Sequence, residues 1–118
     1  MKTSYHQEED SRLAIVDLVD YSELAAKRFP DIRKIYLLAR LSVPPAIRGR
    51  GLARKLLTDI TTDADRAQVV LILHHHPYRG IDPQRLIRLY TQFGFESKTD
   101  GSMMRMPRPQ NEYLLPSS

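Results

Sequence analysis

The stretch Arg48-Gly49-Arg50-Gly51-Leu52-Ala53 decides the fold, because it joins an apolar, strand-like segment to a strongly periodic helix. Two glycines in such a connection favour a tight turn that leaves backbone N–H groups pointing outward. These groups lie at the positive end of the following helix dipole, and Arg48, Arg50 and Arg54 add full positive charges. The turn therefore predicts a binding site for a phosphate or a pyrophosphate.

The segments on either side of the turn predict an α/β protein. Ile35 to Val43 has the pattern of a strand with Ile35, Leu37, Ala39, Leu41 and Val43 on one side, and Pro44-Pro45 ends it. A helix follows the turn, with an apolar stripe of Leu52, Ala53, Leu56, Leu57, Ile60, Ala64 and Ala67 that only Asp63 interrupts. The apolar run from Val69 to Leu73 is typical of a central strand covered on both faces.

The rest of the chain adds elements at both ends of this unit. Arg12 to Asp20 predicts a strand, and Ser22 is placed as the N-cap of a short helix over Glu23 to Arg28. A second helix begins near Asp82-Pro83 and ends before Gly94, with Leu86, Leu89, Tyr90 and Phe93 on one face. Residues 95–99 and 102–106 predict a hairpin around Asp100-Gly101. The expected order gives a sheet of mixed direction in a single domain, residues 1–109, followed by a tail, residues 110–118.

Composition limits the classes of function. The 118 residues contain no cysteine, which excludes thiol catalysis and disulfides, and no apolar run approaches the roughly 18 residues of a membrane span. Without a secretion signal at its polar start, the chain is expected in the cytoplasm and not in a membrane. Residues 1–31 carry four basic and seven acidic side chains, whereas residues 32–118 carry fourteen and seven. The basic residues gather around the glycine turn without interleaved aromatics, which favours a small anion over nucleic acid.

Two common phosphate-binding patterns fail at this turn. A nucleotide P-loop needs Lys-Ser or Lys-Thr after its last glycine, where this chain has Leu52-Ala53. The dinucleotide fingerprint needs a third glycine or alanine where this chain has Arg54, whose long side chain would obstruct close helix packing.

A third pattern, Arg/Gln-x-x-Gly-x-Gly/Ala, is matched by Arg48, Gly51 and Ala53. Together with Leu89-Tyr90-Thr91-Gln92-Phe93-Gly94-Phe95, it resembles the GCN5-related N-acetyltransferase (GNAT) superfamily over about Ile35 to Met106. The resemblance implies a mixed, largely antiparallel sheet with a central, splayed parallel strand pair, flanked by helices. It also implies acetyl-CoA as co-substrate, with the pantetheine arm at Leu41, Ser42 and Val43. The pyrophosphate would then lie at Arg48, Gly49, Arg50, Gly51, Leu52, Ala53 and Arg54.

Catalytic roles follow for a tyrosine and for two histidines. Tyr90, with an ordinary pKa near 10, would protonate the departing CoA thiolate, although a purely packed aromatic explains its position too. His74 and His76 fall on one face after the buried strand, and one of them would accept the proton of the substrate amine; polar strand-end residues in solvent are the alternative. Two histidines fall short of the three or four ligands of a zinc site, so no metal is expected.

The chain departs from the superfamily in two places. Pro83 stands where many members have an asparagine, and only about 34 residues precede the first matching strand. The short front leaves the acceptor amine open, whether on a small molecule or on a protein. Either the chain is a minimal version of the family, or a second copy completes the sheet and the site as a homodimer, which is the prediction. Acetyl transfer to a primary amine is the expected function. A catalytically inactive regulator that binds CoA or protein is the alternative.

Overall fold

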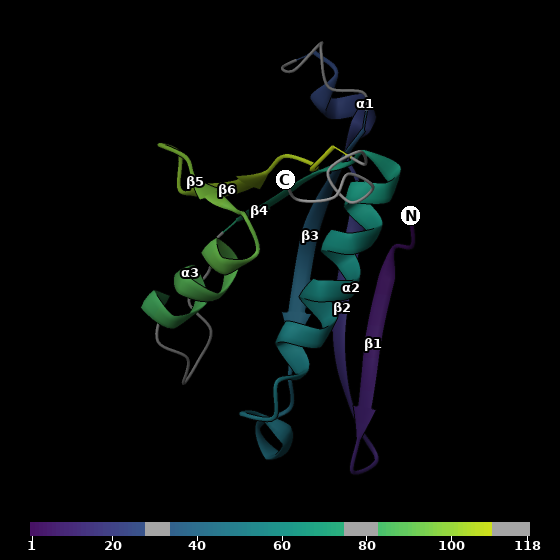
Figure 1. The fold of residues 1–118 in the computed structure, drawn as a ribbon, viewed down its shortest axis with the longest axis vertical. Coiled ribbons are helices and arrows are strands. Elements are labelled where there is room, and N and C mark those ends of the chain that lie inside the picture. Colours follow the sequence, from purple (N-terminus) through teal and green to yellow (C-terminus); the bar gives the residue numbers. More distant parts are fainter. Residues whose placement is uncertain (28–33, 75–82, 110–118) are drawn as a thin grey trace, which may run out of the picture.

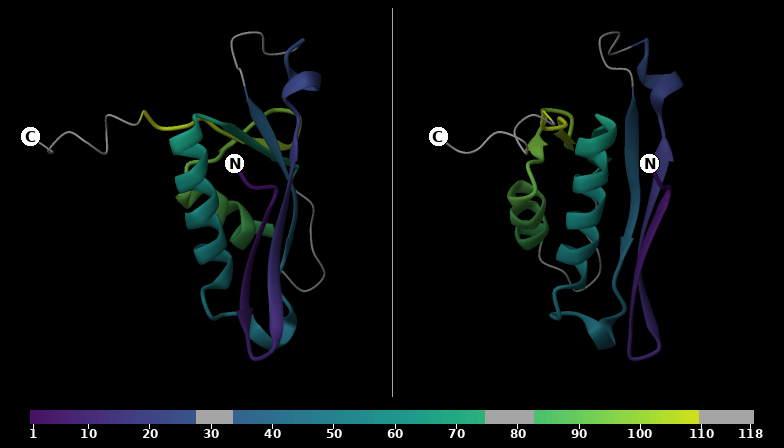
Figure 2. Two further views of the ribbon diagram at one scale, coloured as in Figure 1. Left: turned by 90° about the vertical axis from the view of Figure 1, so that its right-hand side faces the viewer. Right: turned by 45° about the vertical axis from the view of Figure 1, so that its right-hand side comes forward.

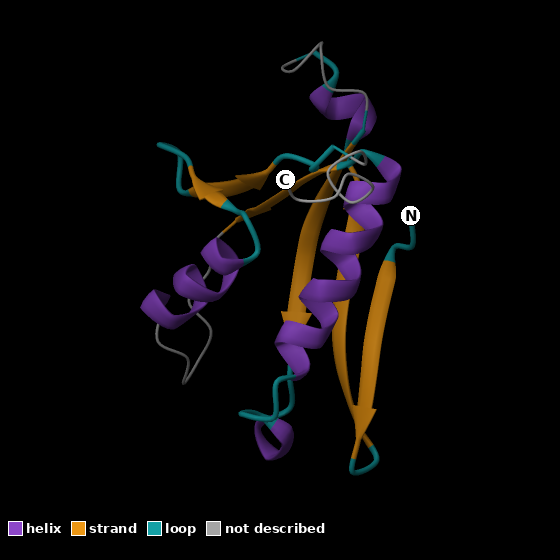
Figure 3. Cartoon of the chain, in the orientation of Figure 1, coloured by secondary structure: helices purple, strands orange, loops and turns teal. Residues whose placement is uncertain are grey.

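The computed structural model describes residues 1–27, 34–74 and 83–109. Within these ranges the elements are β1 (Ser4–Glu9), β2 (Arg12–Asp20), α1 (Ser22–Ala25), β3 (Ile35–Ser42), a 3-10 turn η1 (Pro45–Ile47), α2 (Leu52–Ala67), β4 (Val70–His74), α3 (Pro83–Gln92), β5 (Glu96–Ser97) and β6 (Ser102–Arg105). The strands form one sheet in the order β1-β2-β3-β4-β6-β5 (Figures 1 and 3). Only β3 and β4 pair in parallel, so the predicted mixed sheet with a central parallel pair is confirmed.

The helices α2 and α3 lie on the same face of the sheet (Figure 2). Both supply buried side chains to the main core, in which Leu56, Leu57 and Ile60 of α2 have no exposed surface. Tyr90 of α3 and Phe95, the residue before β5, join the same core. A smaller cluster of Ile35 and Val70 lies on the opposite face. None of the described helices is long and apolar enough to cross a membrane.

A bulge in β3 changes which side chains face the helices. The pairing of β2 with β3 steps from Asp17 and Arg40 to Leu18 and Leu38, which leaves Ala39 as an extra residue. Because one added residue reverses the alternation, Leu41 joins Leu38 in the main core while Ile35 packs on the other face. The predicted grouping of Ile35 with Leu41 on one side of this strand is therefore wrong.

The strand β1 was not expected from its polar sequence. It pairs with β2 from Ser4 opposite Asp17 to Glu9 opposite Arg12. One apolar contact anchors it: Tyr5 is buried in the main core, and its hydroxyl donates to Asp63 Oδ2 at 2.6 Å. The same bond supplies a partner for Asp63, the carboxylate that interrupts the apolar stripe of α2.

Two smaller predictions, one for each end of a helix, are wrong, and the prediction of the last hairpin is confirmed. Ser22 is not an N-cap, because Tyr21 takes that position and the Ser22 hydroxyl accepts the Ile35 N–H at 3.2 Å. Ala67, the last residue of α2, is exposed instead of completing the apolar stripe of the helix. The hairpin of β5 and β6 is confirmed, with Gly101 at a φ of +85° in its turn.

Candidate functional site

The glycine turn ends in a helix N-terminus whose backbone donors remain available. Gly49 has a φ of +80°, and Gly51, the N-cap of α2, has a φ of +77°. Space is open around both α-carbons, so the left-handed backbone, and not crowding, is what calls for glycine. No side chain caps this helix, and its first bond runs from the Lys55 N–H to the Gly51 carbonyl at 3.1 Å. The three N–H groups before Lys55 therefore have no acceptor within the helix.

The parallel strands separate beside this turn. Pairing of β3 with β4 runs from Ile35 opposite Val70 to Leu38 opposite Leu73 and stops there. β3 continues to Ser42 along β2, whereas β4 turns away from it (Figure 1). Within the described chain, the last four residues of β3 have no strand neighbour on that edge. This is the splayed parallel pair that the resemblance implies.

A cavity of about 670 Å³ connects these two features, a volume within the usual range for ligand sites. One wall is the end of β3, a second is the glycine turn with the first turn of α2, and a third is α3. Most of the cofactor-binding residues expected from the sequence line it, namely Leu41, Val43, Arg48, Gly49, Gly51, Leu52, Ala53 and Arg54. Ser42 and Arg50 do not.

Arg50 is turned away from the cavity, toward the turn between β1 and β2. Its Nη1 lies 2.5 Å from Asp10 Oδ2 and 3.8 Å from Glu9 Oε1. The hydrogen bond and the charge of Asp10 raise the pKa of Arg50 above its ordinary value. The side chain thus ties the glycine turn to the first hairpin, while its backbone remains part of the turn.

Four arginines line the cavity: Arg48, Arg54, Arg85 and Arg88. Arg48 also donates from Nε to the Val43 carbonyl at 2.9 Å, which joins the glycine turn to the end of the β3 segment. Within the described ranges, no carboxylate lies at ion-pair distance from any of the four. Arg85 and Arg88 were not predicted as site residues, because their spacing of three residues indicates only a shared face of the helix.

The expected catalytic residues lie in different surroundings. Tyr90 is 4% exposed, its ring meets the Phe95 ring edge-on at 5.7 Å, and it is not part of the cavity lining, although its neighbour Leu89 is. His74 is the exposed last residue of β4, opposite Ser102 of β6. His76 lies outside the described residues. The described part of the chain holds no group of three or more side chains able to bind a metal ion.

This arrangement of a splayed parallel pair and a glycine-capped helix agrees with comparisons to known proteins. The family described as acetyltransferase (GNAT) domain matches residues 7–97, so the chain belongs to the GNAT acetyltransferase family and is an N-acetyltransferase by class. The match begins within β1, well before the region whose motifs carry the resemblance. The family uses acetyl-CoA. No curated protein matches the chain in sequence.

Solved structures share the fold at low sequence identity. An N-acetyltransferase from Staphylococcus aureus Mu50 is 18% identical with a TM-score of 0.58, over 86% of this chain and 67% of that one. The anti-CRISPR protein AcrVA5 is 15% identical with a TM-score of 0.57, over 87% of this chain and 98% of that one. A chain of the NatC complex bound to Gag peptide and CoA is 13% identical with a TM-score of 0.57, over 86% and 65%. The fold is thus found both in chains about as long as this one and in longer chains.

Proposed function

We propose that the protein transfers an acetyl group from acetyl-CoA to a primary amine by direct attack within a ternary complex. The observation that carries this proposal is the cavity that joins the N-terminus of α2, α3 and the end of β3, whose edge toward β4 has no strand neighbour in the described chain. Free N–H groups, and arginines that have no carboxylate partner among the described residues, suit a pyrophosphate. The strand edge that β4 leaves open suits the amide groups of a pantetheine arm. Both features occur in one continuous space.

Binding comes first in this proposal. The pyrophosphate lies against the N–H groups from Gly49 to Arg54, with Arg48 and Arg54 beside it. The arm follows Leu41, Ser42 and Val43 toward the point where β3 and β4 separate. Family membership supports the co-substrate, since GNAT enzymes use acetyl-CoA.

Chemistry then needs one new bond, one broken bond and two proton movements. The amine nitrogen attacks the thioester carbonyl carbon, and the C–S bond breaks to release a thiolate. A backbone N–H near Val43 polarises the carbonyl, and Tyr90 gives its proton to the sulfur. The amine proton passes to His74 or His76, directly or through water. The chain has no cysteine, so this proposal needs no acyl-cysteine intermediate.

The acceptor is an amine of a small molecule or of a protein, in a cytoplasmic setting. We also propose a homodimer. Its support is a row of apolar residues in register across the sheet face opposite α2 and α3: Val19, Leu37, Ile72 and Met104. Val19 is 44% exposed, which is high for an apolar side chain in a sheet. Sedimentation as a monomer at working concentration would contradict this assembly.

The test of the function begins with native mass spectrometry of the purified protein for bound CoA species. The same preparation is then given acetyl-CoA and a panel of small amines and peptides, and free thiol is followed over time. Amine-dependent thiol release with a matching mass gain of the acceptor is expected. Tight CoA binding without transfer to any amine would favour a regulator that binds CoA without catalysis. Failure to bind CoA would contradict the proposal altogether.

A further inference from the structure

Two walls of the cavity carry positive charge, and they come from different segments of the chain. The wall at the glycine turn combines backbone N–H groups with the side chains of Arg48 and Arg54. The wall formed by α3 offers the side chains of Arg85, in the first turn of that helix, and Arg88, in its second turn. The α3 wall therefore presents two guanidinium groups that are three residues apart on one helix.

Two guanidinium groups on one wall suit a terminal phosphate. A phosphate monoester has three outer oxygens and nearly two negative charges, which two planar guanidinium groups contact in paired hydrogen bonds. CoA has two separate phosphate sites, the pyrophosphate and a monoester on the 3′-oxygen of its ribose. If the glycine turn holds the first, the second requires another basic surface in the same space.

A purely structural role does not account for Arg85 and Arg88. Arg40, Arg50 and Arg105 each lie within 2.8 Å of a carboxylate oxygen, and each thereby joins two segments of the fold. Arg85 and Arg88 are exposed and have no carboxylate partner among the described residues, and α3 contains no acidic residue. Like charges three residues apart on a helix repel one another, and an anion bound between them removes that cost.

We propose that Arg85 and Arg88 form a subsite for the ribose 3′-phosphate and make the enzyme select CoA over its 3′-dephospho form. The subsite rests on the proposed function, because it assumes that acetyl-CoA occupies the cavity. It adds a determinant on α3 to the determinants on the glycine turn. The two walls then recognise different phosphates of one molecule.

Calorimetric titration with CoA and with 3′-dephospho-CoA tests this assignment, since the two probes differ only in that phosphate. The wild-type protein is expected to bind CoA at least about tenfold more tightly, the size of one charge-assisted hydrogen bond. The double variant Arg85→Gln/Arg88→Gln should lose this preference by weakening CoA alone. Arg54→Gln, on the other wall, should weaken both probes by the same factor. Arg66→Gln, an exposed arginine of α2 outside the cavity, should change neither.

Three results would overturn the subsite. Equal binding of both probes by the wild-type protein is the first, and equal weakening of both probes by the double variant is the second. In either case CoA binding itself survives, so the proposed function stands. Binding of neither probe by a folded wild-type protein is the third result, and it would remove the proposed function together with the subsite. Thermal melting of each variant confirms that the helix is intact.

Discussion

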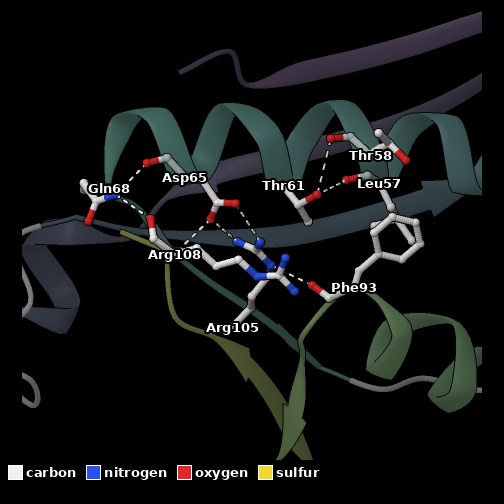
Figure 4. A network of polar contacts seen from close by, with 8 residues as sticks. All are labelled: Leu57, Thr58, Thr61, Asp65, Gln68, Phe93, Arg105 and Arg108. Atoms are coloured by element: carbon white, nitrogen blue, oxygen red, sulfur yellow. Dashed lines mark hydrogen bonds and ion pairs between the residues drawn. The ribbon is translucent and has the colours of Figure 1, made fainter. Parts of the chain in front are cut away.

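The carboxylate of Asp65 on α2 accepts two hydrogen bonds from the guanidinium of Arg105 on β6, at 2.8 and 3.0 Å. Both side chains are almost completely buried (Figure 4). Arg105 also donates from Nε to the Phe93 carbonyl at 2.7 Å, and the Arg108 N–H donates to Asp65 at 2.9 Å. The pair joins the end of α2 to the segment that follows α3. It therefore links, through β6, the two helices whose residues line the cavity.

Removing one partner of this pair should be costly. Asp65→Ala leaves a buried guanidinium without its anion, and we expect the free energy of unfolding to fall by about 3–5 kcal/mol in urea titrations. The double variant Asp65→Leu/Arg105→Met should lose much less, because no charge stays buried. As a control, Asp17→Ala breaks the exposed pair with Arg40 and should cost about 1 kcal/mol or less. Equal losses from both alanine variants would show that burial does not strengthen the Asp65 pair.

Gly51 should be required for backbone shape more than for space. Its φ of +77° costs an alanine about 1–2 kcal/mol, although nothing lies within 4 Å of the added carbon. Gly51→Ala should therefore reduce stability by this amount and weaken CoA binding, while Gly51→Asn, which tolerates this conformation better, should lose less. Gly101 has a φ of +85° and open space in a distant turn. Gly101→Ala should lose as much stability as Gly51→Ala, but its CoA affinity should not change. If both variants bound CoA more weakly, the effect of Gly51 on binding would not be local.

Local signals predicted the elements of the fold that local interactions determine. The stripe from Leu52 to Ile60, the glycine turn and the Asp100-Gly101 hairpin all depend on residues a few positions apart. The strand β1 was missed because only Tyr5 among its residues is buried, and its pairing with β2 depends on backbone bonds. The bulge at Ala39 was missed because it is a property of the pairing with β2, which the β3 sequence does not encode by itself.

The candidate site also has features that consecutive residues predict and features that depend on tertiary packing. The turn from Arg48 to Arg54 was visible because a family motif and helix-end physics concern consecutive residues. That Arg50 would turn toward Asp10, 40 positions earlier, depends on where the first hairpin lies in three dimensions. The convergence of Arg85 and Arg88 on the same cavity depends on how α3 packs, which no spacing within α3 specifies.

Tyr5 should make stability depend on pH in the alkaline range. Burial, followed by the hydrogen bond to Asp63, raises the pKa of its phenol well above the ordinary value. The folded state thus favours the neutral phenol, so this contribution is complete below a pH of about 10 and is lost as the pH rises toward the folded pKa. Near neutral pH, Tyr5→Phe should be less stable by about 1 kcal/mol.

The check is the difference in unfolding free energy between the wild-type protein and Tyr5→Phe at about pH 8 and about pH 11. The difference should shrink at the higher pH, because the unfolded wild-type chain ionises its phenol and the folded chain does not. All other ionisable groups are the same in the two proteins, so the comparison isolates the phenol of Tyr5. A constant difference would mean that Tyr5 ionises equally in both states.

Removing the hydroxyl of Tyr90 distinguishes a chemical role of this residue from a packing role. Tyr90→Phe keeps the ring against Phe95 and removes only the hydroxyl, so the core should remain packed. If the hydroxyl protonates the leaving thiolate, kcat should fall about 100-fold or more while CoA affinity changes little. Tyr36→Phe removes the hydroxyl of another buried tyrosine, on β3, to which no chemical role is assigned, and should leave kcat unchanged. Turnover by Tyr90→Phe within a few-fold of wild type would assign Tyr90 to the core alone, and the thiolate would then take its proton from water.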